Sequence, residues 1–271
     1  MKIPFFISVF SISTICFSQS IQYSKSAYEI HGTEKMIIES AVLNESKEIF
    51  IGLPSNFNDS TQYPLIVVLE GEILFETISP LTRLMSETNE IPECIVIGIP
   101  LLNKHIDYAP KISSVPESGN ADKMLEFYHF ELFPLLDSLY NLTEDKIIWA
   151  HSGLAGIFCT YLLLGPDNQF TGILSSSPNL QWMQEYINKE NAFEFLLKKK
   201  KVFYFLTFGG NEPEVYMGRM YQQVQDFNEK LKAEAPINLT WKYQLNENNN
   251  HFTNAIETYV EGLIMYFNIM K

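Results

Sequence analysis

The sequence predicts an α/β fold with helices on both faces of a mostly parallel central sheet. Apolar runs of strand length recur along the chain, at 65–69, 95–99, 147–149, 172–174, 202–208 and 239–243. Helical patterns lie between or after them, at 122–140, 154–164, 214–235 and 252–270. Strands that alternate with helices favour a doubly wound sheet. Unbroken apolar runs are typical of strands buried on both faces.

Two further β-like runs precede these strands and predict an antiparallel hairpin at the N-terminal end of the sheet. They cover 36–43 and 48–53, and the polar residues 44–47 between them are expected to form the turn. No internal repeat or low-complexity linker divides the chain. Residues 21–271 are therefore expected to form one domain.

Composition limits the classes of partner. The chain has 271 residues, of which 46% are hydrophobic and 14% aromatic, so it can bury a large core and is not globally disordered. Its formal charge of −13 disfavours nucleic acid and anionic membranes as partners. The sequence does not indicate an oligomeric state.

The first twenty residues resemble a secretory signal peptide, with one lysine, an apolar run and a small-residue exit. We expect cleavage near 18–20 and a periplasmic or extracellular protein without a membrane span. Cys16 would leave with this segment, whereas Cys94 and Cys159 are expected to be buried free thiols. No Cys/His spacing resembles a zinc site, so no metal is expected.

The segment 146–158 carries the clearest chemical signal. It is an apolar strand, a serine between small residues and an apolar helix, which is the layout of the nucleophile elbow of the α/β-hydrolase fold. Ser152 is the candidate nucleophile. Leu154 stands where the G-x-S-x-G pattern has its last glycine, and the sequence leaves open whether it impairs the turn. The second serine cluster, 175–177, is interpreted as a strand end.

A hydrolase serine needs a general base, and His251 is the best candidate among five histidines. It follows the last strand and precedes the final helix, which is where this fold places its base. His31 lies in the lead-in and His129 on a helix. His151 is expected to point away from the nucleophile, and His105, in the long loop 101–120, could contact substrate.

The orienting acid should follow the fifth buried strand. Glu212 is the first carboxylate there, and Glu214 is the alternative, although it could instead begin the next helix. One oxyanion donor is expected at Gly153, directly after the serine. The second is expected in the loop 70–75, at the amide of Gly71 or Glu72.

Several segments, in this order, resemble the putative esterase family of α/β-hydrolases, which includes siderophore esterases, S-formylglutathione hydrolase and the mycolyltransferase antigens. The matching segments are 63–72, 91–99, 118–127, 131–134, 175–182, 251–253 and 261–263. Glu70 stands where the family has aspartate, and Asp107 is similar to an aspartate that in the family follows an arginine. Lys104 or His105 occupies the arginine's place.

The resemblance implies a serine esterase with Ser152 and His251 as the catalytic pair and no cofactor. It suggests a small-molecule ester, of the siderophore or aryl type, as substrate, with carbohydrate esters equally open. His105, Asp107 and Trp182 are the candidate substrate-binding residues. Two alternatives remain: an acyltransferase on the same scaffold, and a non-catalytic binding protein that keeps the fold.

Overall fold

The computed structural model describes residues 24–25, 30–100, 108–113, 115–116, 118–151, 153–166 and 169–270. The strands are β1 (Thr33–Ser40), β2 (Glu45–Gly52), β3 (Tyr63–Leu69), β4 (Ile95–Ile99), β5 (Leu142–Ala150), β6 (Gly172–Ser176), β7 (Val202–Gly209) and β8 (Leu239–Asn246). The α-helices are α1 (Gly71–Glu87), α2 (Ala121–Phe127), α3 (Phe133–Leu139), α4 (Gly153–Leu164), α5 (Gln184–Ile187), α6 (Glu214–Met217), α7 (Arg219–Glu234) and α8 (His251–Ile269). Short helices of other types are η1 (Tyr128–Leu132), η2 (Leu180–Met183) and η3 (Leu196–Lys198).

These strands form one sheet in the order β1-β2-β4-β3-β5-β6-β7-β8. The strands from β3 to β8 pair in parallel, and β1 and β2 form the antiparallel hairpin at one edge. The predicted fold class is thus confirmed. Every buried run of the sequence analysis is a strand or part of one, because each has apolar side chains for both faces of the sheet.

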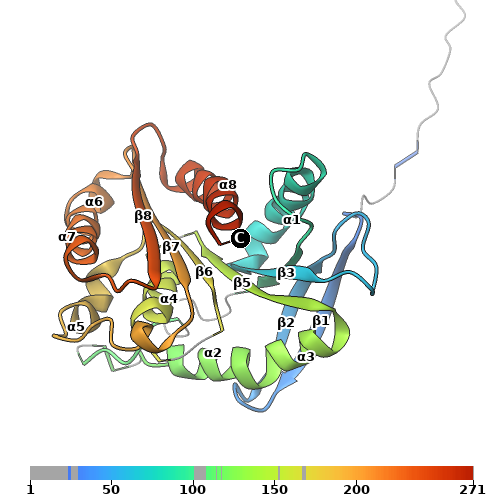
Figure 1. Cartoon of the computed structure of the whole chain (residues 1–271), viewed down its shortest axis with the longest axis horizontal. Helices are drawn as coiled ribbons and strands as arrows, with labels where there is room; N and C mark the ends of the chain where they lie inside the picture. The colour runs from blue at the N-terminus through green and yellow to red at the C-terminus, as the bar shows by residue number, and fades with distance from the viewer. Residues whose placement is uncertain are drawn as a thin grey trace, which may run out of the picture.

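Helices cover both faces of the sheet (Figure 1). On one face, α1 and α8 pack over a core that includes Ile66 and Val68 of β3. On the other face, α2, α3, α4 and α7 pack over a larger core that includes Leu65 and Val67. Alternate residues of one strand therefore belong to different cores, as the two-residue period of a strand requires.

The hairpin turn lies earlier than the sequence predicted. Ser40 pairs with Glu45, so the turn is formed by residues 41–44 and not by 44–47. Glu131 of η1 holds it: its carboxylate accepts hydrogen bonds from Ala41 N at 2.9 Å, from Val42 N at 3.0 Å and from Ser40 Oγ. A side chain from a helix far away in the sequence thus caps the turn of the hairpin.

The loop expected at 70–75 is in fact the beginning of α1, a helix that the sequence analysis missed. Ile73 N and Leu74 N donate to the carbonyl of Glu70 at 3.0 and 3.1 Å, which starts the helix directly after β3. The helix predicted at 214–235 also differs, because it is divided at Gly218 into α6 and α7.

The order of the strands places a crevice-forming position between β3 and β5. From β3 the chain crosses to β4 on one side, whereas β5 pairs with β3 on the other side. Ligands of open α/β sheets bind at the carboxyl ends of strands at such a switch point. Glu70 follows β3 and His151 follows β5, so both lie there. Among the described residues, no helix has the length and apolar character that a bilayer span requires.

Candidate active site

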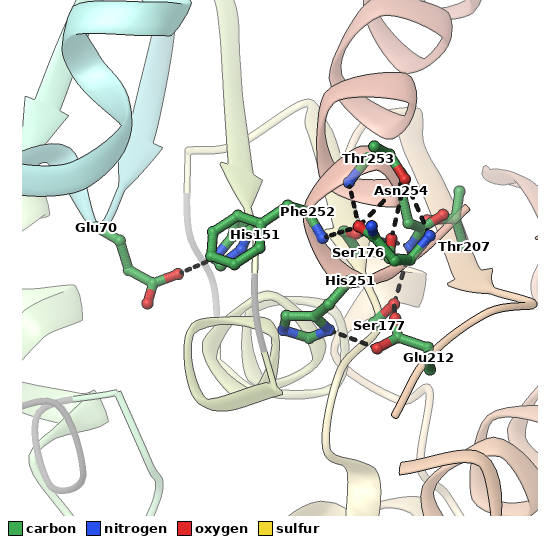
Figure 2. A network of polar contacts seen from close by, with 11 residues as sticks. Glu70, His151, Ser176, Ser177, Thr207, Glu212, His251, Phe252, Thr253 and Asn254 are labelled. Atoms are coloured by element: carbon green, nitrogen blue, oxygen red, sulfur yellow. Dashed lines mark hydrogen bonds and ion pairs between the residues drawn. The ribbon is translucent and has the colours of Figure 1, made fainter. Parts of the chain in front are cut away.

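The structure brings His251 and Glu212 together at the carboxyl end of the sheet (Figure 2). Nδ1 of His251 lies 2.8 Å from Oε2 of Glu212. The Glu212 side chain is fully buried and that of His251 is 18% exposed. The Tyr216 ring packs 5.5 Å from the His251 ring, centroid to centroid. A buried carboxylate thus holds a histidine whose ring remains accessible from outside.

Two backbone hydrogen bonds hold the loop after β7 against the loop after β8. Gly210 N donates to Asn246 O at 2.8 Å, and Asn211 N donates to Asn249 O at 2.9 Å. A Cβ atom on Gly210 would lie 2.3 Å from the carbonyl oxygen of Glu247, so only glycine permits this approach. The sequence Gly-Gly-Asn-Glu therefore places Glu212 beside the start of α8.

His251 is the first residue of α8, and the cap of this helix fixes its position. The Asn250 side chain accepts from Phe252 N at 3.0 Å and Thr253 N at 3.1 Å. In return, Thr253 Oγ1 accepts from Asn250 N at 2.9 Å, which completes a capping box. The histidine thus lies on an ordered helix start and not on a free loop.

Ser177 and Asn254 support the buried acid, and the sequence analysis missed both. Ser177 Oγ donates to Oε1 of Glu212 at 2.5 Å, and Asn254 Nδ2 donates to Ser177 Oγ at 2.8 Å. The same amide nitrogen also contacts Ser176 Oγ at 2.8 Å and Thr207 Oγ1 at 3.1 Å. Since an amide nitrogen only donates, the one proton of the Ser177 hydroxyl is left for Glu212.

A second glutamate–histidine pair lies beside the first and faces the candidate base, whereas the expectation that His151 points away from Ser152 stays a prediction. Nδ1 of His151 lies 2.9 Å from Oε2 of Glu70. The His151 ring packs 5.2 Å from the His251 ring. The carboxylate that follows β3 thus holds the His151 side chain beside His251.

Some of the other predicted residues lie outside the described part of the chain, and others begin helices. Ser152, His105 and Asp107 lie outside the described residues, as do Cys16 and the leader segment 1–20. Gly153 is the first residue of α4, and Gly71 and Glu72 begin α1. All three follow carboxyl ends of strands at the switch point. Their role as oxyanion donors stays a prediction.

Four other positions weighed in the sequence take no part in the hydrogen bonds described above for this site. Glu214, the alternative acid, is exposed on the first turn of α6. Trp182 lies on η2 and packs, half-buried, against the larger core. His31 is exposed, and His129, on η1, contacts Gln169. Of the two acids that the sequence left open, Glu212 is the one that contacts His251.

The two described cysteines are buried free thiols, as the sequence predicted. Burial raises the pKa of each thiol well above its usual range, and for Cys94 the nearby Asp145 and Glu93 raise it further. Neither lies among the polar residues of the site.

The geometry suits proton transfer at one atom. When Nδ1–H of a neutral imidazole donates to a carboxylate, Nε2 carries the lone pair and can accept a proton. The buried Glu212 then stabilises the imidazolium that forms. Aligned groups of this kind serve nucleophilic and general-base chemistry, for which no metal ligand or cofactor is required.

Comparisons with known proteins define the class. An IroE-like serine hydrolase from Shewanella oneidensis superimposes with a TM-score of 0.77 and 23% identity, over 87% of this chain and 80% of that one. The BES protein from Bacillus cereus gives a TM-score of 0.75 with 21% identity, over 89% and 98% of the two chains. These similarities confirm an α/β-hydrolase-like fold.

Residues 40–252 match the family described as "Putative esterase", and the chain belongs to this family. One relative, the Ferri-bacillibactin esterase BesA of Bacillus subtilis (strain 168), is 25% identical over 233 residues, which cover 77% of this chain and 80% of BesA. The protein is accordingly a carboxylic ester hydrolase.

Proposed function

We propose that the protein is a serine esterase in which Ser152 is the nucleophile, His251 the general base and Glu212 the orienting acid. Ser152 Oγ attacks the ester carbonyl while Nε2 of His251 takes its proton. The alcohol leaves with that proton, and water, activated by the same histidine, releases the acid from the acyl-enzyme.

The observation that carries this proposal is the contact of 2.8 Å between His251 and the buried Glu212. Burial of a carboxylate carries a large desolvation penalty. A buried glutamate that faces a partly exposed histidine is therefore better explained by a catalytic unit than by stability alone. The residues on either side of Ser152 in the sequence support the same assignment, because the His151 ring packs against the ring of the candidate base and Gly153 begins α4.

The oxyanion is assigned to the amides of Gly153 and of Gly71 or Glu72. They begin helices that follow two neighbouring strands, where helix dipoles favour negative charge. A Cβ atom on Gly71 would lie 2.7 Å from the backbone of both Gly98 and Ile99. Only glycine therefore lets α1 start this close to the end of β4.

For the substrate we propose a small-molecule ester of the siderophore class. The support is the similarity to BesA, whose name gives ferri-bacillibactin as its ester. We further propose that the protein is exported, on the pattern of residues 1–20, and N-terminal sequencing of the protein recovered outside the cytoplasm tests this.

The experiment that tests the proposed chemistry uses short p-nitrophenyl esters. The wild-type chain should release p-nitrophenol continuously, and the Ser152→Ala variant should lose this turnover by at least about 10³-fold. Circular dichroism of the variant controls for folding. Equal turnover by the two proteins would refute the assignment. Transfer of the acyl group to an added alcohol, in place of hydrolysis, would favour an acyltransferase.

A further inference from the structure

The buried pair formed by Glu70 and His151 connects the beginning of α1 to the residue before the candidate nucleophile. Oε2 of Glu70 and Nδ1 of His151 lie 2.9 Å apart, and their side chains are 8% and 7% exposed. Glu70 directly precedes the first amides of α1, and His151 directly precedes Ser152. One hydrogen bond thus joins the N-cap of α1, directly after β3, to the residue that follows β5.

The ring of His151 also contacts the beginning of α8 (Figure 2). It packs 4.9 Å from the Phe252 ring at an interplanar angle of 31° and 5.2 Å from the His251 ring at 70°. The first contact is tilted, and the second is edge-to-face, a favourable arrangement of two rings. A single side chain therefore contacts the segment of the oxyanion donors, by its hydrogen bond, and the segment of the base, by its ring.

The backbone at Glu70 and Gly71 is strained and closely packed against β4. Glu70 has φ +57° and ψ +41°, a left-handed conformation that is unfavourable for a residue with a side chain. Gly71 next to it has no space for a Cβ atom against β4. Such strain persists where the surroundings impose it, and it is concentrated at functional sites. The side-chain hydrogen bond to His151 is made by this same residue.

We propose that Glu70 and His151 are positioning residues that fix the oxyanion donors after β3 relative to the elbow and to His251. This inference rests on the proposed function, because it concerns the same site. Neither residue moves a proton in the reaction. They keep the amide of Gly71 or Glu72 at the distance from Gly153 at which both can bind one oxygen, and a displacement of about 1 Å costs on the order of 100-fold in rate.

The test is a mutant cycle of Glu70→Leu, His151→Phe and the double variant, measured with a p-nitrophenyl ester. His151→Phe keeps a ring against Phe252 and removes the hydrogen bond. Each single variant leaves a buried polar group without one of its partners and should lower Tm, whereas the double variant removes both groups and should recover much of the lost stability. Glu76→Gln, a change at an exposed position of α1, is the matched control.

The readouts separate positioning from stability. We expect the folded double variant to keep KM within about threefold while kcat per active site, counted by fluorophosphonate titration, falls at least about tenfold. Inhibition by a phenylboronate, which forms a tetrahedral adduct in the oxyanion site, should weaken by a similar factor. Glu70→Gln keeps an acceptor for Nδ1–H, should fold, and should retain most of kcat.

Two results would overturn the inference. In the first, kcat and boronate affinity return with Tm in the double variant, which would make the pair merely structural. In the second, the losses of the two single variants multiply, which would mean that the residues act independently. A wild-type chain that neither hydrolyses esters nor reacts with the fluorophosphonate would refute the proposed function itself, and with it this inference.

Discussion

The hydroxyl oxygen of Ser177 lies 2.5 Å from Oε1 of Glu212, while Oε2 of the same carboxylate faces His251. Ser177 has φ +43°, a conformation uncommon for serine, directly after β6. Asn254, one helical turn after His251 on α8, donates to the Ser177 hydroxyl. The helix that carries the candidate base therefore also supports the candidate acid.

Removal of this support should slow the reaction. A hydrogen bond to a charged group contributes about 1.5–3 kcal/mol, so Ser177→Ala should lower kcat by about tenfold or more, with little change in KM. Initial rates of p-nitrophenyl ester hydrolysis over a range of substrate concentrations give both kcat and KM. Ser175→Ala, a change of the same size at an equally buried position of β6, serves as control. Equal kcat values for the two variants would show that Glu212 does not depend on Ser177.

The choice between the two candidate acids can be decided by a matched pair of variants. Glu212→Gln removes the charge that faces His251 and should lower kcat by about 10²–10⁴-fold, since it destabilises the imidazolium. Glu214→Gln, on the exposed start of α6, should stay within about twofold of wild type. A larger loss for Glu214→Gln than for Glu212→Gln would reverse the assignment.

The two buried thiols should be inert in the folded protein. Burial raises the pKa of Cys94 and Cys159 well above the usual range, so neither is a thiolate at neutral pH, and the thiolate is the reactive form. A chain that begins after residue 20 should react with Ellman's reagent only after a denaturant is added, and then at two sites. Fast reaction of either thiol under native conditions would contradict its burial.

Glu131 should make the hairpin sensitive to acid. Burial alone would raise the pKa of this carboxyl, but the hydrogen bonds from Ser40, Val42 and Ala41 outweigh it and hold the pKa below its ordinary value of 4.5. A lowered folded-state pKa contributes stability above the unfolded-state value, and this contribution is lost as pH falls through the folded-state value.

Glu131→Gln should therefore lower Tm at pH 7 by about 2 °C, a small effect because the carboxylate is only partly buried. The difference from wild type should shrink below about pH 4.5, where the wild-type carboxylate begins to be protonated. Thermal unfolding across this range, with the exposed change Glu126→Gln as control, measures it. A difference that grows as pH falls would have the wrong sign.

Most of the sheet could be predicted because strands buried on both faces are recognisable as unbroken apolar runs. The runs that became β3, β4, β5, β6, β7 and β8 carry apolar side chains for two cores, and no tertiary information is needed to find them. Helix α1 was missed because its local sequence disfavours a helix. Pro80 lies in its middle, where proline is strongly disfavoured, and packing on β4 overrides that local preference.

The candidate site was predictable only where a residue's place along the chain determines its place in the fold. His251 and Glu212 follow strands whose ends meet, so their contact could be anticipated. The roles of Ser177, Asn254 and His151 depend on side chains that meet across different elements. One signal was available for Asn254: it lies three residues after His251, near the beginning of the predicted final helix, a spacing that puts two helical residues on the same face.

The most direct test of the central claim is the reaction of the folded protein with a fluorophosphonate, followed by peptide mapping. We expect about one adduct per chain, on Ser152, with no labelling of the Ser152→Ala variant and much slower labelling of His251→Ala. An adduct on another serine, or labelling that persists in Ser152→Ala, would contradict the assignment of Ser152 as the nucleophile that His251 activates.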